Sequence, residues 1–430
     1  MEIPRPDLLA KLIARRENGM VKVITGIRRC GKSYLLTKLY RDHLLASGVA
    51  QDHIVELALD DVANARYRNP LELDTYVRTR LVDPSSMYYV FLDEIQKVKT
   101  IANPYLEGET IGFIDVALGL MRMSNVDLYV TGSNSHMLSS DILTEFRGRG
   151  DEVRVHPLTY REFHGAYSGE TPAWREYLTY GGMPFILSRS THEGKSSYLK
   201  SLFIEIYLQD IVERNDIRND IAVLGDLLDV VSSSVGSLTN PTRLANTFRS
   251  ERRIAISSDT IRQYLDYFVD AYLIDKVQRY DVKGNRYIET PLKYYFTDVG
   301  LRNARLNFRQ QEENHLMENV LYNDLRARGF DVDVGVVEYN GVDASGKKVR
   351  TQLEVDFVAN KGDRRYYIQS AWAMYDEEKC AQETASLRRI GDSFGKIVVV
   401  KDPIVPWHDD KGILYVGVEQ FLLDERAIDG

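Results

Sequence analysis

The chain has 430 residues, of which 44% are hydrophobic and 27% are charged, a composition typical of globular proteins. This length is too great for one hydrophobic core and predicts about two to four domains. The net charge of −8 argues against nucleic-acid binding over the whole surface, although a local basic patch is compatible with it.

Several common protein classes are disfavoured by simple sequence features. Apolar runs are too short to span a bilayer, and the first residues lack the layout of a signal peptide. The two cysteines, Cys30 and Cys380, are far apart in the chain and do not suggest a disulfide framework. We therefore expect a cytoplasmic protein with no membrane partner.

The first segment with recognisable chemistry is the loop at residues 26–33. Residues 21–25 form a β-branched run that predicts a strand, and residues 34–40 have the leucine spacing of a helix. The sequence GIRRCGKS between them fits the pattern GxxxxGK[ST], whose backbone N–H groups and helix N-terminus bind phosphates. Lys32 is expected on the outer phosphates and Ser33 on Mg²⁺, whereas Cys30 is expected to be a small loop residue and not a nucleophile. The cofactors are thus expected to be ATP and Mg²⁺, with the nucleotide bound by Gly26, Ile27, Arg28, Arg29, Cys30, Gly31, Lys32, Ser33 and Tyr34.

A second apolar run, residues 87–92, ends in Asp93 and Glu94. A buried parallel strand has this composition, and ligands bind at the carboxyl ends of such strands in open α/β sheets. We expect Asp93 to hold Mg²⁺ and Glu94 to polarise the attacking water. The alternative for this short pattern is an ordinary turn.

A third apolar strand, residues 126–130, leads into Thr131, Gly132, Ser133 and Asn134. The small polar side chains at this strand end, Ser133 among them, are candidate contacts to the γ-phosphate or the water. The equal alternative is a plain turn in which Ser and Asn cap a helix. Arg147 and Arg149 follow, before a strand-like segment at residues 152–155. They are either solvated surface residues or cations that neutralise transition-state charge in a neighbouring subunit's site.

In this order the motifs resemble those of the AAA+ superfamily of P-loop ATPases. Further details resemble the prokaryotic AAA ATPases that carry a C-terminal DUF4143 region: GIRRxGKS, LDEIQ at 92–96, YVTGSNS at 129–135, HPLTYREF at 156–163, YGGMP at 180–184 and YFTDVGLR at 295–302. The resemblance implies that Lys32 and Ser33 form Walker A and that Asp93 and Glu94 form Walker B. It also implies Ser133 near the sensor-1 position, an arginine finger at Arg147 or Arg149, an active homo-oligomer and the strand order 5-1-4-3-2.

The middle of the chain is predicted to be a helical lid followed by a winged-helix-like domain. Residues 241–310 contain thirteen Lys and Arg against eight Asp and Glu, a local charge of +5. Two helices, the second beginning at Ser258, and a hairpin turning at residues 283–285 have the order of a winged helix. One interpretation is DNA binding, with Asp259, Thr260, Arg262 and Gln263 facing a major groove and Lys283 and Arg286 on phosphate. The other is a winged helix that serves protein contacts or lid support.

The C-terminal part resembles the PD-(D/E)xK nuclease fold. Glu318 lies on a predicted helix, Glu354 and Asp356 share one face of a predicted strand, and the next strand follows at residues 365–369. Two carboxylates hold Mg²⁺ and a lysine activates water in that fold. Gln369 and Ala371 stand where the second carboxylate and the lysine are expected, so we expect the fold without nuclease activity.

The fold class is therefore expected to be α/β with four parts: a P-loop AAA+ core at 1–156, a helical lid at 157–225, a winged-helix-like domain at 226–310 and a nuclease-like (DUF4143) domain at 311–430. The leading functional hypothesis is an ATP-hydrolysing molecular switch that acts on DNA, through residues 241–310, or on a protein partner. The alternatives are an ATP-gated, metal-dependent DNA nuclease and a signalling or scaffold ATPase without nucleic acid.

Overall fold

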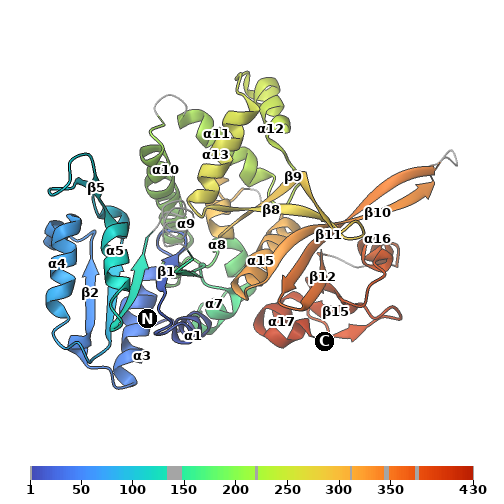
Figure 1. The fold of residues 1–430 in the computed structure, drawn as a ribbon. Coiled ribbons are helices and arrows are strands. Elements are labelled where there is room, and N and C mark those ends of the chain that lie inside the picture. The colour runs from blue at the N-terminus through green and yellow to red at the C-terminus, as the bar shows by residue number, and fades with distance from the viewer. Residues whose placement is uncertain are drawn as a thin grey trace. The chain divides into compact units, whose positions relative to one another are not determined.

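The computed structural model describes residues 2–132, 148–217, 221–309, 312–342, 348–372 and 377–429. They divide into two compact units, Met1–Pro157 with Asp270–Tyr272, and Leu158–Val269 with Leu273–Gly430 (Figure 1). In the described parts of the chain, no helix combines the length and the apolar character that crossing a membrane requires. The expected division into four domains stays a prediction.

The first unit alternates strands and helices. Its helices are α1 (Pro6–Ala14), α2 (Lys32–Tyr34), α3 (Arg41–Ala46), α4 (Pro70–Arg80) and α5 (Phe113–Met121), and a π-helical segment, Leu35–Tyr40, joins α2 to α3. Its strands are β1 (Val21–Thr25), β2 (Ile54–Ala58), β3 (Tyr88–Asp93), β6 (Val126–Thr131) and β7 (Gly150–Arg154), with a small hairpin of β4 (Ile101–Ala102) and β5 (Thr110–Ile111).

These five long strands form one parallel sheet in the order β2-β3-β6-β1-β7. Counted along the chain as strands one to five, this is the expected order 5-1-4-3-2, which is confirmed. Every residue of β1 and β3 is buried, because helices cover the sheet and leave no solvated face. Apolar side chains of α4 and α5 pack on the sheet in one continuous core. Parallel pairing brings the carboxyl ends of β1, β3 and β6 to the same edge.

The second unit begins with helices and continues into a large sheet. The helices are α7 (Tyr160–Ala166), α8 (Ala173–Tyr180), α9 (His192–Ser201), α10 (Gln209–Arg214), α11 (Ile221–Ser233), α12 (Pro241–Thr247), α13 (Ser258–Asp270), α14 (Val299–Arg305), α15 (Glu313–Ala327), α16 (Glu377–Thr384) and α17 (Val418–Leu423). The strands are β8 (Ile274–Asp281), β9 (Arg286–Phe296), β10 (Asp331–Val342), β11 (Lys348–Lys361), β12 (Arg364–Ala371), β13 (Gly395–Val400), β14 (Trp407–His408) and β15 (Leu414–Gly417).

The eight strands of this unit form a mixed sheet in the order β14-β15-β13-β12-β11-β10-β8-β9. The predicted hairpin at residues 276–288 is present as β8 and β9, and β8 pairs in parallel with β10, so the hairpin extends the C-terminal sheet. Figure 1 shows β10 and β11 as a long two-stranded arm. The winged-helix interpretation of residues 226–310 stays a prediction.

Two glycine-containing motifs of the second unit pack against each other. Asp298 caps α14 by accepting a hydrogen bond from Leu301 N at 3.0 Å, and its other oxygen accepts from Gly182 N at 2.6 Å. A Cβ at Gly300 would lie 1.9 Å from the Tyr180 carbonyl oxygen, so only glycine permits this approach. Burial raises the pKa of the Asp298 carboxyl to about 6. The segments 180–184 and 295–302 are therefore joined through one buried carboxylate.

Candidate nucleotide-binding site

The loop between β1 and α2 has the backbone geometry of a phosphate-binding loop. Gly26 has φ +133° and Gly31 has φ +103°, both in the region that favours glycine. A Cβ at Gly26 would lie 2.1 Å from the Val155 carbonyl oxygen, so both the backbone conformation and the lack of space exclude a side chain there. Backbone conformation thus favours glycine at both positions, and close packing against the residue after β7 requires it at Gly26 as well.

Lys32 begins the helix that follows the loop, and its side chain turns back into the loop. Its Nζ donates to the carbonyl oxygens of Gly26 at 2.9 Å and Ile27 at 3.2 Å, and the residue is only 5% exposed. The ammonium therefore lies within the curve of the loop, where this motif binds the outer phosphates of a nucleotide. The expected role of Lys32 on the outer phosphates stays a prediction.

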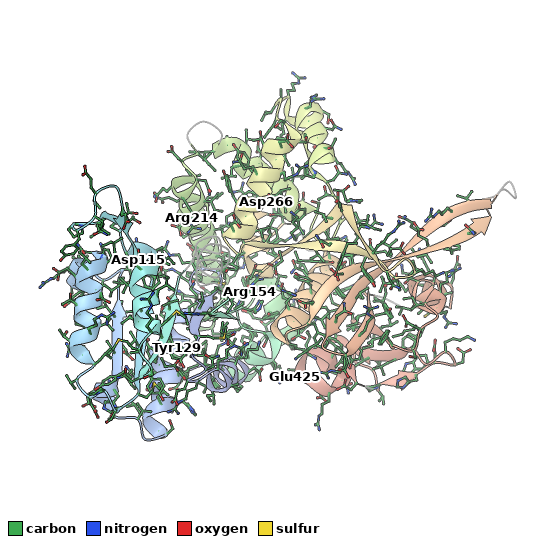
Figure 2. All side chains as sticks on the ribbon, viewed as in Figure 1. Asp115, Tyr129, Arg154, Arg214, Asp266 and Glu425 are labelled. Carbon is green, nitrogen blue, oxygen red and sulfur yellow. The ribbon has the colours of Figure 1, made fainter. Side chains whose placement is uncertain are left out.

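Thr131, one of the small polar residues expected at the end of the third strand, holds the end of β3. Its hydroxyl donates to the Asp93 carboxylate, and the same oxygen accepts the backbone N–H of Glu94 at 3.1 Å. The register of β3 and β6, with Leu92 opposite Val130, places these strand ends side by side. Figure 2 labels Tyr129, which lies on β6 two residues before Thr131 and so marks this strand end in the picture. A hydroxyl at the last position of the strand was the available sequence signal.

Glu94 lies just beyond β3 with φ 56° and ψ 51°, a left-handed conformation that is uncommon for a non-glycine residue. Its carboxylate accepts a hydrogen bond from the Gln96 side-chain amide. Burial raises the pKa of the Glu94 carboxyl, and the nearby Lys32 ammonium opposes that shift. A carboxylate with a raised pKa beside a phosphate-binding loop suits general-base chemistry.

Arg5, a residue that the sequence analysis did not select, holds the backbone of the loop through hydrogen bonds. The Arg5 guanidinium is 5% exposed and donates to the carbonyl oxygens of Cys30 at 3.2 Å and His156 at 2.9 Å. The Cys30 thiol contacts the Val155 carbonyl oxygen at 3.2 Å, and burial raises its pKa. A buried thiol with a raised pKa is a poor nucleophile, in agreement with the structural role expected for Cys30.

The described residues of the first unit fit a nucleotide with Mg²⁺. Asp93 and the P-loop residue Ser33 belong to elements that meet at the same sheet edge, and Mg²⁺ is commonly held by one or two protein oxygens together with substrate phosphates. Where the structure describes the chain, no three His, Cys, Asp or Glu side chains are arranged to hold a metal by themselves. A magnesium site here would thus be completed by the nucleotide.

Other predicted residues lie elsewhere or outside the described ranges. Ser133 and Arg147 fall outside the described residues. The Arg149 carbonyl oxygen accepts from Val21 N at 3.0 Å, at the amino end of β1 and so at the sheet edge opposite the P-loop. Arg149 is therefore remote from the P-loop of its own chain, and its assignment as a finger stays a prediction.

The predicted DNA contacts lie in the second unit. Asp259 and Arg262 are exposed on α13 and form an ion pair at 3.3 Å. Lys283 and Arg286 line an open cavity of about 540 Å³ together with Asp281, Gly284, Glu338, Tyr339, Asn340 and Arg350. The Lys283 ammonium donates to the Glu338 carbonyl oxygen at 3.1 Å, and Arg286 lies 3.4 Å from Asp281. The cavity is polar and carries charges of both signs.

Comparison with known families agrees with the geometry of the first unit. Residues 18–164 match the model of an AAA domain, and residues 171–312 match a domain of unknown function, DUF8612. The DUF4143 region that we expected is not shown, because the model matching the middle of the chain is a different one.

Two relatives extend along nearly the whole chain. An uncharacterized protein of Haemophilus influenzae is 30% identical over 403 residues, covering 92% of this chain and 93% of the relative. An uncharacterized protein of Methanocaldococcus jannaschii is 27% identical over 439 residues, covering 98% and 87%.

Solved structures give weaker likenesses. A Walker-type ATPase of Pyrococcus abyssi is 14% identical, covers 71% of this chain and 96% of its own, and has a TM-score of 0.48. The Orc1 protein of Aeropyrum pernix in complex with DNA is 11% identical, covers 71% and 93%, and has a TM-score of 0.31. Both scores are too low to carry an argument about this chain.

The loop geometry, the strand order, the AAA domain match and the relative at 30% identity agree with one another. Residues 18–164 therefore form an AAA domain of the P-loop ATPase type, and the chain as a whole belongs to one family with its Haemophilus influenzae relative.

Proposed function

We propose that this protein hydrolyses ATP in a Mg²⁺-dependent reaction and acts as a molecular switch. The observation that carries the proposal is the convergence of Lys32, Asp93, Glu94 and Thr131 at the carboxyl edge of one parallel sheet. That edge is where ligands bind in open α/β folds.

In the proposed reaction, residues 26–34 cradle the phosphates and Lys32 binds the outer ones. Ser33 and Asp93 would hold the metal, and a bound Mg²⁺ would neutralise charge on the β- and γ-phosphates. Thr131 fixes the orientation of the Asp93 carboxylate. Glu94 accepts a proton from the attacking water and orients it in line with the γ-phosphate. Ser133 remains a candidate contact to that water.

A complete site in this proposal includes a second subunit. Arg149 lies at the sheet edge opposite its own P-loop, a location that leaves it available to another chain. We therefore propose a homo-oligomer in which Arg147 or Arg149 stabilises the transition state of a neighbour's site, as trans-acting arginines do in P-loop enzymes.

For the second unit we propose a lid at 157–225 and a nuclease-like fold without nuclease activity at 311–430, the region likened to DUF4143. The element order α15-β10-β11-β12-α16-β13 supports the nuclease-like fold. DNA is one proposed partner of residues 241–310, and the support for it is that Lys283 and Arg286 line one open cavity, which Arg350 lines as well beside Asp281 and Glu338. A protein partner, and a scaffold ATPase without nucleic acid, remain the competing proposals.

Steady-state ATP hydrolysis and nucleotide binding, each measured with and without DNA, test the proposal. Lys32→Ala should lose ATP binding and at least about 100-fold of hydrolysis, whereas Glu94→Gln should bind ATP and lose hydrolysis. Lys99→Ala, at an exposed lysine of the same unit, is the matched control. Full hydrolysis by Lys32→Ala would refute the assignment of the site.

The DNA proposal has its own measurement. A salt titration of DNA binding should show a log–log slope that falls by about two in Lys283→Ala/Arg286→Ala, because two phosphate contacts are lost. Lys411→Ala, at an exposed lysine on another loop, should leave the slope unchanged. Absence of binding at low salt by the wild type would favour a protein partner.

A further inference from the structure

Lys293 is a buried lysine that lies among carboxylates of the second unit. The sequence analysis expected no lysine there, because Ala371 stands at the position of the nuclease lysine. Lys293 is on β9, Glu318 is on α15, and Glu354 and Asp356 are on β11. Lys293 Nζ lies 2.8 Å from Glu318 Oε1, 2.6 Å from Glu354 Oε1 and 3.9 Å from Asp356 Oδ1. The Lys293 side chain is 3% exposed, so these carboxylates provide its charge compensation.

The surrounding groups hold the carboxylates in place. The Tyr295 hydroxyl donates to Glu318 Oε1 at 2.6 Å, and the Ser370 backbone N–H donates to Asp356 Oδ2 at 2.8 Å. His315 Nδ1 lies 3.8 Å from Glu318 Oε2. The cluster is therefore fixed by α15, β9, β11 and β12 together, which are all parts of one unit.

Gln369 supplies an independent sign that the cluster is built around a cation. The register of β11 and β12, with Phe357 opposite Ile368, places Gln369 opposite Asp356 on the same sheet face. The residue is 9% exposed, and its side-chain carbonyl oxygen has no hydrogen-bond partner among the described residues. Glu318 and Asp356, which are buried, Glu354, which is one-third exposed, and the Gln369 amide oxygen on the face of Asp356 are all oxygen donors, the kind that a hard divalent cation prefers.

The observed cation at this place is the Lys293 ammonium itself. Three carboxylates so close together would repel one another in a low-dielectric site without a positive charge among them. An ammonium held by Glu318 and Glu354 supplies that charge, and it fills the space between them. Where the structure describes the chain, no group of His, Cys, Asp or Glu side chains is arranged to hold a metal, so a metal site here requires the carboxylates to move together once the ammonium is gone.

We propose that Lys293 is a built-in cation that takes the place of a divalent metal among Glu318, Glu354 and Asp356, and that removing its side chain opens a site for one such ion. The wild-type unit then binds no divalent metal there and cleaves no phosphodiester bond. This proposal is independent of the ATPase function, because every residue in it belongs to the second unit.

Mn²⁺ binding to the full chain tests the proposal, measured by electron paramagnetic resonance without nucleotide so that the P-loop site is not completed. Mn²⁺ binding by the wild type should be the same as that of Asp356→Asn and Glu354→Gln, because the wild-type cluster holds no metal. Lys293→Ala should bind one Mn²⁺ that the wild type does not bind, and Lys293→Ala/Asp356→Asn should bind it at least tenfold more weakly than Lys293→Ala. Lys293→Met, which removes the charge but keeps most of the volume, should bind less Mn²⁺ than Lys293→Ala.

Two results would overturn the proposal. One is a wild-type chain that binds one Mn²⁺ per subunit and loses it in Glu354→Gln, or that cuts DNA with Mn²⁺ and loses cutting in the same variant. The other is a folded Lys293→Ala chain that binds no more Mn²⁺ than the wild type. If Lys293→Ala does not fold, the comparison of the wild type with Glu354→Gln decides by itself.

Discussion

Replacing Thr131 by valine removes one hydroxyl and leaves the shape of the side chain nearly unchanged. Thr131 is fully buried, its hydroxyl donates to the Asp93 carboxylate, and it accepts the Glu94 N–H. The variant therefore leaves the carboxylate and the amide each without this partner at the end of β3. The two residues that lose a partner, Asp93 and Glu94, are the proposed Walker B pair. The variant therefore tests their role in ATP hydrolysis as well as the stability of the core.

The expected size follows from the two hydrogen bonds. A bond to a charged acceptor contributes about 1.5–3 kcal/mol and a neutral one about 1 kcal/mol, so the free energy of unfolding should fall by about 2.5–4 kcal/mol. In a unit of this size that lowers Tm by about 5–16 °C. Loss of a group that orients a metal ligand typically costs about 10–100-fold in activity. We expect kcat to fall by that factor and the Mg²⁺ requirement to rise.

The assay is ATP hydrolysis as a function of ATP and Mg²⁺, with thermal unfolding of the same samples. Thr131→Ser is the matched control, because it keeps the hydroxyl and loses one buried methyl, worth about 1 kcal/mol. Thr131→Ser should retain activity within about threefold. A Thr131→Val chain that hydrolyses ATP as fast as Thr131→Ser would refute the role of Thr131 in positioning Asp93 and Glu94.

Three further outcomes are expected. Arg5→Lys should raise KM for ATP about tenfold, because an ammonium cannot reach the Cys30 and His156 carbonyl oxygens together, and Arg80→Lys on the exposed end of α4 should not. Because Glu94 must be ionised to act as a base and burial raises its pKa, kcat/KM should fall with decreasing pH at a pH above the ordinary value of 4.5, and the residual hydrolysis of Glu94→Gln should lack that fall. Asp298 has a folded-state pKa of about 6 against 3.8 in its ordinary state, so its stabilisation is present below pH 3.8 and lost as pH rises through about 6. Urea unfolding of the wild type should then show a loss of up to about 3 kcal/mol across that window, which Asp298→Asn should lack.

Local sequence predicted the first unit well. The GxxxxGK[ST] pattern needs left-handed glycines at fixed positions, and an apolar strand that ends in two carboxylates needs burial along its whole length. Both constraints act within a few residues, so they were visible at Gly26, Gly31, Asp93 and Glu94 before any folding. The strand order came from the family resemblance, since parallel pairing joins strands that are far apart in the chain.

The second unit was harder to predict because its contacts depend on pairing between distant strands. The helices and the hairpin near residues 241–288 were expected as elements, but the parallel pairing of β8 with β10 has no local signal. That pairing joins strands separated in the chain by β9, α14 and α15, and the sequence carries no pattern for it.

The sequence by itself determined the chemistry of the phosphate-binding loop, because backbone conformation and residue type are fixed there at short range. Only the tertiary structure decided which distant side chains complete each cluster. Thr131 on β6 donates a hydrogen bond to Asp93 on the neighbouring strand β3. Arg5, just before α1, donates to the phosphate-binding loop, and Lys293 on β9 forms ion pairs with carboxylates on α15 and β11. Each contact joins residues that only the folded backbone brings within hydrogen-bond distance, so chain position alone does not reveal them.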